Sequence, residues 1–117
     1  MGSRVMTEPA FFVLTALVDE PRHGYGILRV AEELSAGRVR LKVGTLYGVL
    51  DRLVAEGLVE LDHEEAYQGR LRRYYRLTEP GVDALEAEAA RLASNVESAR
   101  ERLRARSRRP STAEGTA

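Results

Sequence analysis

The stretch from residue 42 to residue 78 constrains the fold of this chain more than any other. Its first part has apolar residues at the three- and four-residue spacing of one helix face: Leu46, Val49, Leu50 and Leu53. Gly57 then suits the position after a helix, because glycine readily adopts the left-handed backbone conformation found there. Two extended segments follow, with a turn at Gly69 and four arginines in the second segment. A helix followed by a basic β-hairpin is the arrangement of a winged helix-turn-helix, which predicts DNA binding.

The segments before this stretch predict two more helices. A Thr-Glu-Pro sequence at residues 7–9 is typical of a helix start, and residues 10–18 are apolar on almost every side, as in a buried helix. A second helix is expected over about residues 25–35. Residues 38–41 are a short extended piece that could add one strand. The predicted fold class is mainly α with a small antiparallel β-hairpin, a winged helix-turn-helix followed by a long C-terminal dimerisation helix.

The last helix carries the most regular apolar pattern. We expect it to run from Thr78 to about Arg106, with apolar residues spaced by 4, 3, 4, 3 and 4: Leu85, Ala89, Leu92, Val96, Ala99 and Leu103. This heptad pattern is typical of a seam between two paired helices. At 1.5 Å per residue, ~25 residues span roughly 40 Å, which is longer than a domain this small can cover. The pattern therefore predicts dimerisation, and the alternative is that the stripe folds back on its own domain.

The chain divides into three predicted parts. Residues 1–78 would form the DNA-binding domain, residues 79–106 the dimerisation helix, and residues 107–117 a disordered tail rich in Arg, Ser, Thr and Gly. A core of Leu, Val and Ala is thin in a chain of 117 residues. Burial between two copies would supplement that core.

Composition excludes several kinds of site. The absence of cysteine rules out disulfides, thiolate catalysis and zinc fingers. His23 and His63 are isolated from each other in the sequence, and neither shows the spacing of a metal ligand or a catalytic base. No apolar stretch approaches the ~18 residues of a membrane span. We therefore expect no enzyme activity, no metal, no cofactor and no membrane contact, and a cytoplasmic location.

Charge is informative through its placement. The formal net charge is zero, so overall charge does not indicate a nucleic-acid partner. Basic residues nevertheless cluster at predicted helix starts and at the hairpin tip. Local placement sets the attraction to a phosphate backbone, so DNA remains a candidate partner.

The predicted third helix, over about residues 43–56, supplies candidate DNA contacts off its apolar stripe. Lys42 and Thr45 can bond phosphates or base edges, while Gly44 and Gly48 let the backbone come close to DNA. The alternative is an ordinary surface helix with solvated charges, and both readings stay open from this helix alone. The candidates are Lys42, Thr45, Tyr47, Gly48 and Arg52.

The hairpin supplies a second group of candidates. Arginines near its turn can bind phosphates or reach into a minor groove: Arg70, Arg72 and Arg73. The alternative is cross-strand ion pairing of Arg72 and Arg76 with acidic residues of the first strand: Glu60, Asp62 and Glu64. We expect Arg76 to be structural, and Arg70 and Arg72 to be available for DNA. Either Tyr74 or Tyr75 should pack in the core, because adjacent strand residues point to opposite faces.

The sequence His23-Gly24-Tyr25-Gly26 precedes the second helix. Its glycines allow a tight turn into that helix. Tyr25 could touch a phosphate near the positive end of the helix, or it could anchor packing.

These motifs together resemble the PadR family of bacterial winged-helix transcriptional regulators, in the short class with one C-terminal dimerisation helix. The matching residues cover about residues 8–106: His23-Gly24-Tyr25-Gly26-Ile27, Gly44-Thr45-Leu46-Tyr47, Leu50, Leu53, Glu56-Gly57-Leu58, Gly69-Arg70, Arg73-Tyr74-Tyr75, Leu77-Thr78 and Gly81.

The resemblance implies a homodimer that represses transcription from an inverted-repeat operator. It places Lys42, Thr45, Tyr47 and Gly48 in the recognition helix, and Arg70, Arg72 and Arg73 in the wing. It also implies release by a small-molecule effector, often a phenolic acid or a planar drug. The last helix has no aromatic residue on which a planar ligand could stack, so the effector pocket is not assigned. A different class of function stays open: a winged-helix protein-interaction module that dimerises without specific DNA binding.

Overall fold

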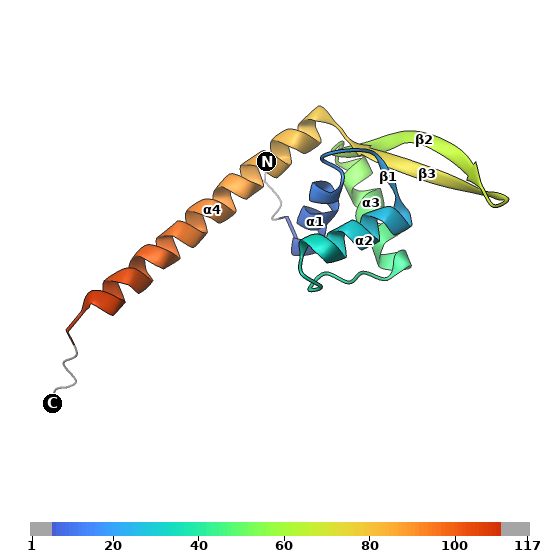
Figure 1. The fold of residues 1–117 in the computed structure, drawn as a ribbon. Helices are drawn as coiled ribbons and strands as arrows, with labels where there is room; N and C mark the ends of the chain where they lie inside the picture. Colours follow the sequence, from blue (N-terminus) through green and yellow to red (C-terminus); the bar gives the residue numbers. More distant parts are fainter. Residues whose placement is uncertain (1–5, 111–117) are drawn as a thin grey trace.

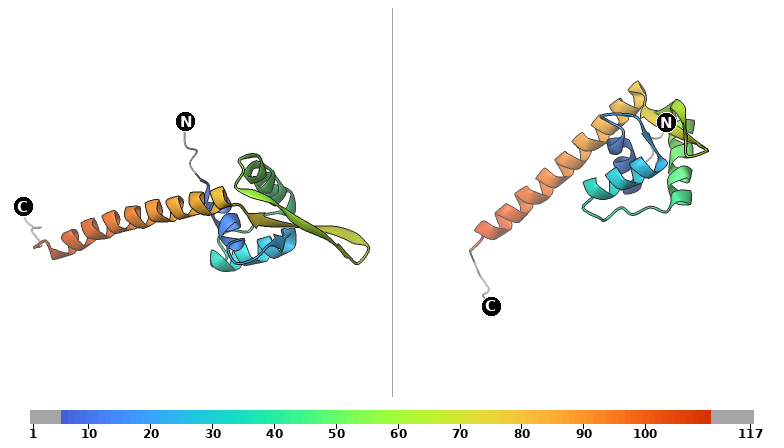
Figure 2. Two further views of the ribbon diagram at one scale, coloured as in Figure 1. Left: turned by 90° about the horizontal axis from the view of Figure 1, so that it is seen from above. Right: turned by 45° about the vertical axis from the view of Figure 1, so that its right-hand side comes forward.

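A shared apolar core joins three short helices to the base of a β-hairpin. The computed structural model describes residues 6–110, and a long fourth helix leads away from this core (Figures 1 and 2). The elements in chain order are α1 (Glu8–Ala16), β1 (Arg22–His23), α2 (Gly24–Leu34), α3 (Val43–Ala55), β2 (Val59–Tyr67), β3 (Arg70–Leu77) and α4 (Glu79–Arg108). The structure confirms the predicted mainly α fold with a winged helix-turn-helix, a small antiparallel hairpin and a long C-terminal helix.

The core contains the apolar stripe that the sequence predicts for α3. Its buried members come from α1, α2, α3 and the hairpin: Val13, Leu14, Ala16, Leu17, Ile27, Leu46, Leu50, Leu53, Val59 and Tyr75. Tyr75 is therefore the tyrosine of the pair that packs inside. α1 begins where its sequence predicts, because the Thr7 hydroxyl accepts a hydrogen bond from the backbone N–H of Ala10 at 3.2 Å.

The junction between α3, the hairpin and α4 is closed by hydrogen bonds. Gly57 has φ of +78°, and the N–H of Leu58 donates to the carbonyl of Leu53 at 2.9 Å, which ends α3. The N–H of Thr78 donates to the carbonyl of Leu58 at 3.1 Å, and the Thr78 hydroxyl donates to the carbonyl of Gly57 at 2.6 Å. The same hydroxyl accepts from the N–H of Gly81 at 3.0 Å and so caps α4.

The hairpin ends in a two-residue turn. Gln68 and Gly69 have φ of +51° and +75°, the left-handed pair of a type I′ turn. β2 and β3 pair from Val59 opposite Leu77 out to Tyr67 opposite Arg70, with an irregularity between Leu61 and His63.

The third strand is not the one that the sequence predicted. Residues 38–41 form no strand; instead Arg22 and His23 pair with β3, giving the sheet order β1-β3-β2. Arg22 is fixed there because its Nε donates to the carbonyl of Ala16 at 2.7 Å. The 38–41 segment is held at the end of α2 instead, where the N–H of Val39 donates to the Ser35 hydroxyl at 2.9 Å.

α4 is longer than predicted and ends at Arg108, two residues beyond the expected end. Ser107 and Arg108 are therefore helical and do not belong to the predicted disordered tail. The rest of that tail from residue 111 lies outside the described residues. Within residues 6–110, no helix combines the length and the apolar character needed to cross a membrane.

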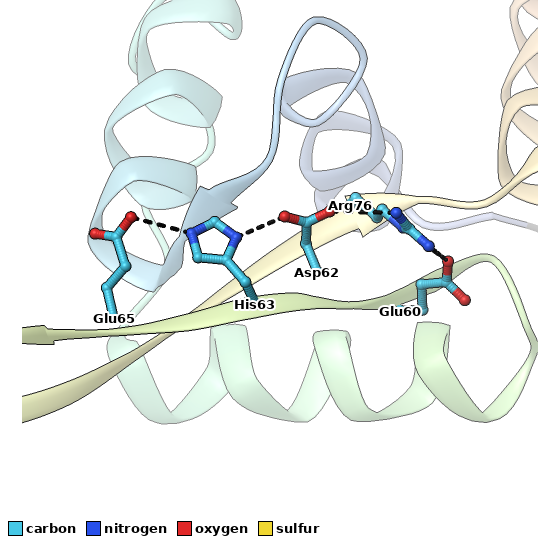
Figure 3. A network of polar contacts seen from close by, with 5 residues as sticks. All are labelled: Glu60, Asp62, His63, Glu65 and Arg76. Atoms are coloured by element: carbon cyan, nitrogen blue, oxygen red, sulfur yellow. Dashed lines mark hydrogen bonds and ion pairs between the residues drawn. The ribbon is translucent and has the colours of Figure 1, made fainter.

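A row of charged residues and stacked rings sits on one face of the hairpin. Tyr74 of the central strand is flanked by His23 of β1 at 5.3 Å between ring centroids and by His63 of β2 at 4.4 Å. Asp62 links His63 to Arg76: its Oδ2 is 2.5 Å from His63 Nδ1, and its Oδ1 accepts from Arg76 Nη1 at 3.3 Å (Figure 3). Hydrogen bonding to Asp62, more than that to Glu65, raises the pKa of His63 above its usual 6.5.

We expect Gly81→Ala to destabilise the protein, because a Cβ at this buried glycine would stand 2.1 Å from the carbonyl oxygen of Leu58. Overpacking of this kind costs about 1–3 kcal/mol in the free energy of unfolding, which urea denaturation would measure. Gly44→Ala is the matched control, since a Cβ there meets nothing within 4 Å. Equal stability of the two variants would contradict the tight junction.

We expect Asp62→Asn to lower the pKa of His63, measured by NMR titration of its imidazole. The folded-state pKa of His63 is raised, so its ionic contacts stabilise the hairpin fully below pH 6.5 and are lost as the pH rises through the folded value. Glu97→Gln removes a carboxylate of α4 that pairs with Arg104 and serves as the control. An unchanged His63 pKa in Asp62→Asn would show that the contact is not formed in solution.

Candidate nucleic-acid interface

The N-terminal half of α3 presents a smooth, uncharged surface with polar groups at its edge. Gly44 and Gly48 lie on the exposed side of the helix, and a Cβ at either would meet nothing within 4 Å. Thr45 is exposed one turn before Gly48, and Lys42 is exposed at the N-cap position. Arg52 is exposed a further turn along, beside Asp51. DNA could therefore approach the backbone of the first two turns closely.

A groove of about 710 Å³ lies between the hairpin tip and the starts of α2 and α3. Five of the predicted DNA contacts line it: Tyr25, Tyr47, Arg70, Arg72 and Arg73. The other four do not line it: Lys42 is the N-cap residue of α3, and the rest lie on the helix itself, namely Thr45, Gly48 and Arg52. The predicted site residues thus fall into two adjoining surfaces, the groove and the exposed face of α3.

The wing arginines differ in how they are held. Arg72 lies over the ring of Tyr67, with its Cζ 3.5 Å from the ring centroid, so its guanidinium is positioned by a cation–π contact and keeps its outward edges free. The Nε of Arg73 donates to Glu64 at 3.2 Å, which partly neutralises it. Arg70 is exposed and has no ion pair among the described residues.

The alternative of cross-strand pairing applies to Arg76, as expected, and not to Arg72. Arg76 Nε donates to Glu60 at 2.7 Å and Arg76 also contacts Asp62 (Figure 3). The sequence did not predict that Glu64 pairs with Arg73, because register alone does not say which of several arginines a carboxylate selects.

Tyr47 is partly a packing residue. Its hydroxyl stands 2.6 Å from the position that a Cβ on Gly24 would take, so the ring lies against the start of α2. The side chain is 39% exposed, and burial raises the pKa of the Tyr47 hydroxyl. Gly24 therefore belongs to the site because it leaves space for Tyr47, whereas the sequence indicated only that it allows a tight turn. Tyr25, by contrast, is 68% exposed and does not anchor packing.

His23 borders the groove and remains neutral more readily than an ordinary histidine. Burial is the largest cause that lowers the pKa of His23, and the guanidinium groups of Arg72 and Arg29 lower it further. The positive charge on this side of the groove comes from arginine.

The predicted dimerisation residues lie along one side of α4. Leu85 packs partly against the core of its own domain. Ala89, Leu92, Val96, Ala99 and Leu103 are exposed, with Leu103 the most open of the large side chains at 62%. Beyond Leu85, the stripe does not fold back on its own domain.

This chain matches one protein family and is similar to individual proteins of known sequence. It matches the family described as "Transcriptional regulator PadR-like family" over residues 13–87. An uncharacterized 37.1 kDa protein of transposon TN4556 from Streptomyces fradiae is 45% identical over 72% of this chain and 24% of its own length. The transcriptional regulator Rv3488 of Mycobacterium tuberculosis is 38% identical over 62% of this chain and 64% of its own length. The chain thus spans less than two thirds of each of these relatives.

Solved structures share the fold. A PadR-like transcription factor from Bacteroides fragilis superposes with a TM-score of 0.67 at 28% identity, covering 79% of this chain and 86% of that one. PadR of Bacillus subtilis, solved in complex with operator DNA, gives a TM-score of 0.59 at 22% identity, covering 67% of this chain and 45% of that one. Because the family match covers more than half of its residues, this chain belongs to the PadR-like family of transcriptional regulators, which are not enzymes.

Proposed function

We propose that this protein binds a specific DNA operator as a homodimer and represses transcription in the cytoplasm. The observation that carries the proposal is the groove, where exposed Tyr25 and the wing arginines adjoin the open face of α3. In this arrangement the first turns of α3 enter the major groove and the wing lies along the backbone or minor groove. That Bacillus subtilis PadR, which has the same fold, was solved in complex with operator DNA supports DNA binding by this fold.

Dimerisation would place two copies of α3 on successive turns of the duplex, about 34 Å apart, so the operator would be an inverted repeat. The exposed apolar stripe of α4 supports the dimer, because Val96 and Leu103 remain 48% and 62% exposed in a single chain. A small-molecule effector would release repression by binding better to a dimer in which that separation no longer fits DNA.

We expect Arg72→Ala to weaken operator binding and to reduce its salt dependence by about one counterion per half-site, because one phosphate contact is lost. Fluorescence anisotropy with labelled operator at several salt concentrations would measure both quantities. Arg76→Ala is the matched control, since Arg76 is already paired with Glu60 and Asp62 on the hairpin. Equal losses in the two variants would argue against a DNA-facing wing, and no specific binding by the unaltered protein would favour an interaction module.

We expect Gly48→Ala to have opposite effects on stability and on binding. A Cβ at this position meets open space, so replacing a helical glycine should raise the free energy of unfolding by about 0.5–1 kcal/mol. The same methyl group would hold the α3 backbone away from DNA and lower operator affinity. A more stable variant with unchanged affinity would show that this face of α3 does not contact DNA.

A further inference from the structure

Three glutamates of β2 lie directly opposite arginines of β3 in the register of the hairpin: Glu60 and Arg76, Glu64 and Arg73, Glu65 and Arg72. Opposite charges at such positions attract each other across a pair of strands. The first two pairs are joined, with nitrogen–oxygen distances of 2.7 Å and 3.2 Å. The third pair is not joined, because within residues 6–110 Glu65 and Arg72 each contact a different residue.

Glu65 and Arg72 lean away from each other along the hairpin. Oε2 of Glu65 is 3.1 Å from Nε2 of His63, which lies toward the hairpin base (Figure 3). Arg72 lies over the ring of Tyr67, toward the turn, with its Cζ 3.5 Å from the ring centroid. His63, Glu65 and Tyr67 share one face of β2, because side chains alternate along a strand. His63 and Tyr67 therefore hold apart two charges that the register places opposite each other.

His63 can hold Glu65 because each of its ring nitrogens faces a carboxylate. Nδ1 lies 2.5 Å from Oδ2 of Asp62, and Nε2 faces Glu65. A neutral imidazole has one N–H, whereas the imidazolium has two and can donate to both carboxylates at once. Stacking on Tyr74 of β3, with 4.4 Å between ring centroids, fixes the direction of the ring.

The choice of partner matters for DNA because Arg72 lines the groove, whereas Glu65 is not among the lining residues. A guanidinium that pairs with a carboxylate offers less charge and fewer donors to a phosphate. A guanidinium stacked on Tyr67 keeps its charge and the N–H groups at its edge.

We propose that His63 is a positioning residue for DNA binding: it holds Glu65 away from Arg72, so that Arg72 stays unpaired in the groove. The inference rests on the proposed operator binding and adds the residue that keeps the wing ready for it. His63 itself is not among the residues that line the groove.

A double-mutant cycle with labelled operator tests the proposal. His63→Phe keeps a ring against Tyr74 and removes both nitrogens, so the released Glu65 should pair with Arg72. Operator affinity should fall about tenfold over the two wings of a dimer, with a smaller salt dependence. Adding Glu65→Gln should restore most of the affinity, whereas Glu65→Gln alone should change it little, because His63 already holds that carboxylate.

Non-additivity is the decisive result of this cycle. Equal gains from Glu65→Gln in both backgrounds would overturn the proposal, because they would reflect only the repulsion between a carboxylate and DNA. Glu60→Gln is the matched control, since it removes the same charge from the same strand but from a glutamate paired with Arg76. It should not rescue His63→Phe, and an equal rescue would also overturn the proposal.

The pH dependence of operator binding gives a second readout. Because the two carboxylates raise the pKa of His63, Asp62 more than Glu65, Glu65 is held below the folded value and released as the pH rises through it. Affinity should fall over this range, and more steeply than in Glu65→Gln. Parallel pH profiles would overturn the proposal. The groups that face His63 directly or through one neighbour are Asp62, Glu65, Tyr74, Arg76 and His23.

Urea unfolding without DNA separates this inference from the proposed function. The coupling free energy between Glu65→Gln and Arg72→Gln should be close to zero in the unaltered protein and should appear in the His63→Phe background. No coupling in that background would overturn the exchange of partners, even if the protein binds operator. A protein that binds no operator would overturn the proposed function, and the coupling would still decide whether His63 holds Glu65 away from Arg72.

Discussion

The rest of the structure depends on the hydrogen-bonded junction at Gly57, Leu58 and Thr78. The Thr78 hydroxyl donates to the end of α3 and accepts from the start of α4, while its N–H joins the carbonyl of Leu58 at the hairpin base. The end of α3, the base of the hairpin and the start of α4 are therefore held together at one junction. The close approach of Gly81 to Leu58 leaves α4 little freedom to change its angle there. Any movement of α4 is consequently transmitted to the hairpin and to α3 together.

Elements with strong local patterns could be predicted from the sequence. The stripe of Leu46, Leu50 and Leu53, and Gly57 after it, identified α3 because helix periodicity and glycine capping are local properties. The expectation that residues 38–41 could add the third strand was wrong, because Arg22 and His23 form it instead. Tertiary contacts hold them there: Arg22 donates to the carbonyl of Ala16, and both residues pair with the edge of β3. A two-residue strand has too little pattern of its own to compete with such contacts.

The candidate site, like the fold, could be predicted from the sequence only in part. Residue types and spacing were enough to select Tyr25, Arg70 and Arg72, all of which line the groove. They were not enough to find the space that Gly24 leaves for Tyr47, because that contact depends on how α2 packs against α3. Nor did they reveal the stacking of Arg72 on Tyr67, because that contact depends on the pairing and twist of the hairpin. Net charge was equally uninformative: a chain of zero net charge still places Arg70 and Arg72, which form no ion pair among residues 6–110, together in the groove.

His23 and His63, which flank Tyr74, affect how the candidate DNA interface responds to pH. The imidazole that borders the groove has a lowered pKa, while the imidazole with a raised pKa lies in the carboxylate row outside the lining of the groove. Near neutral pH, His63 outside the groove therefore binds a proton more readily than His23 in its lining. Because the pKa of His23 is lowered and that of His63 is raised, acidification protonates His63 before His23, and the charge of the groove is set first by its arginines.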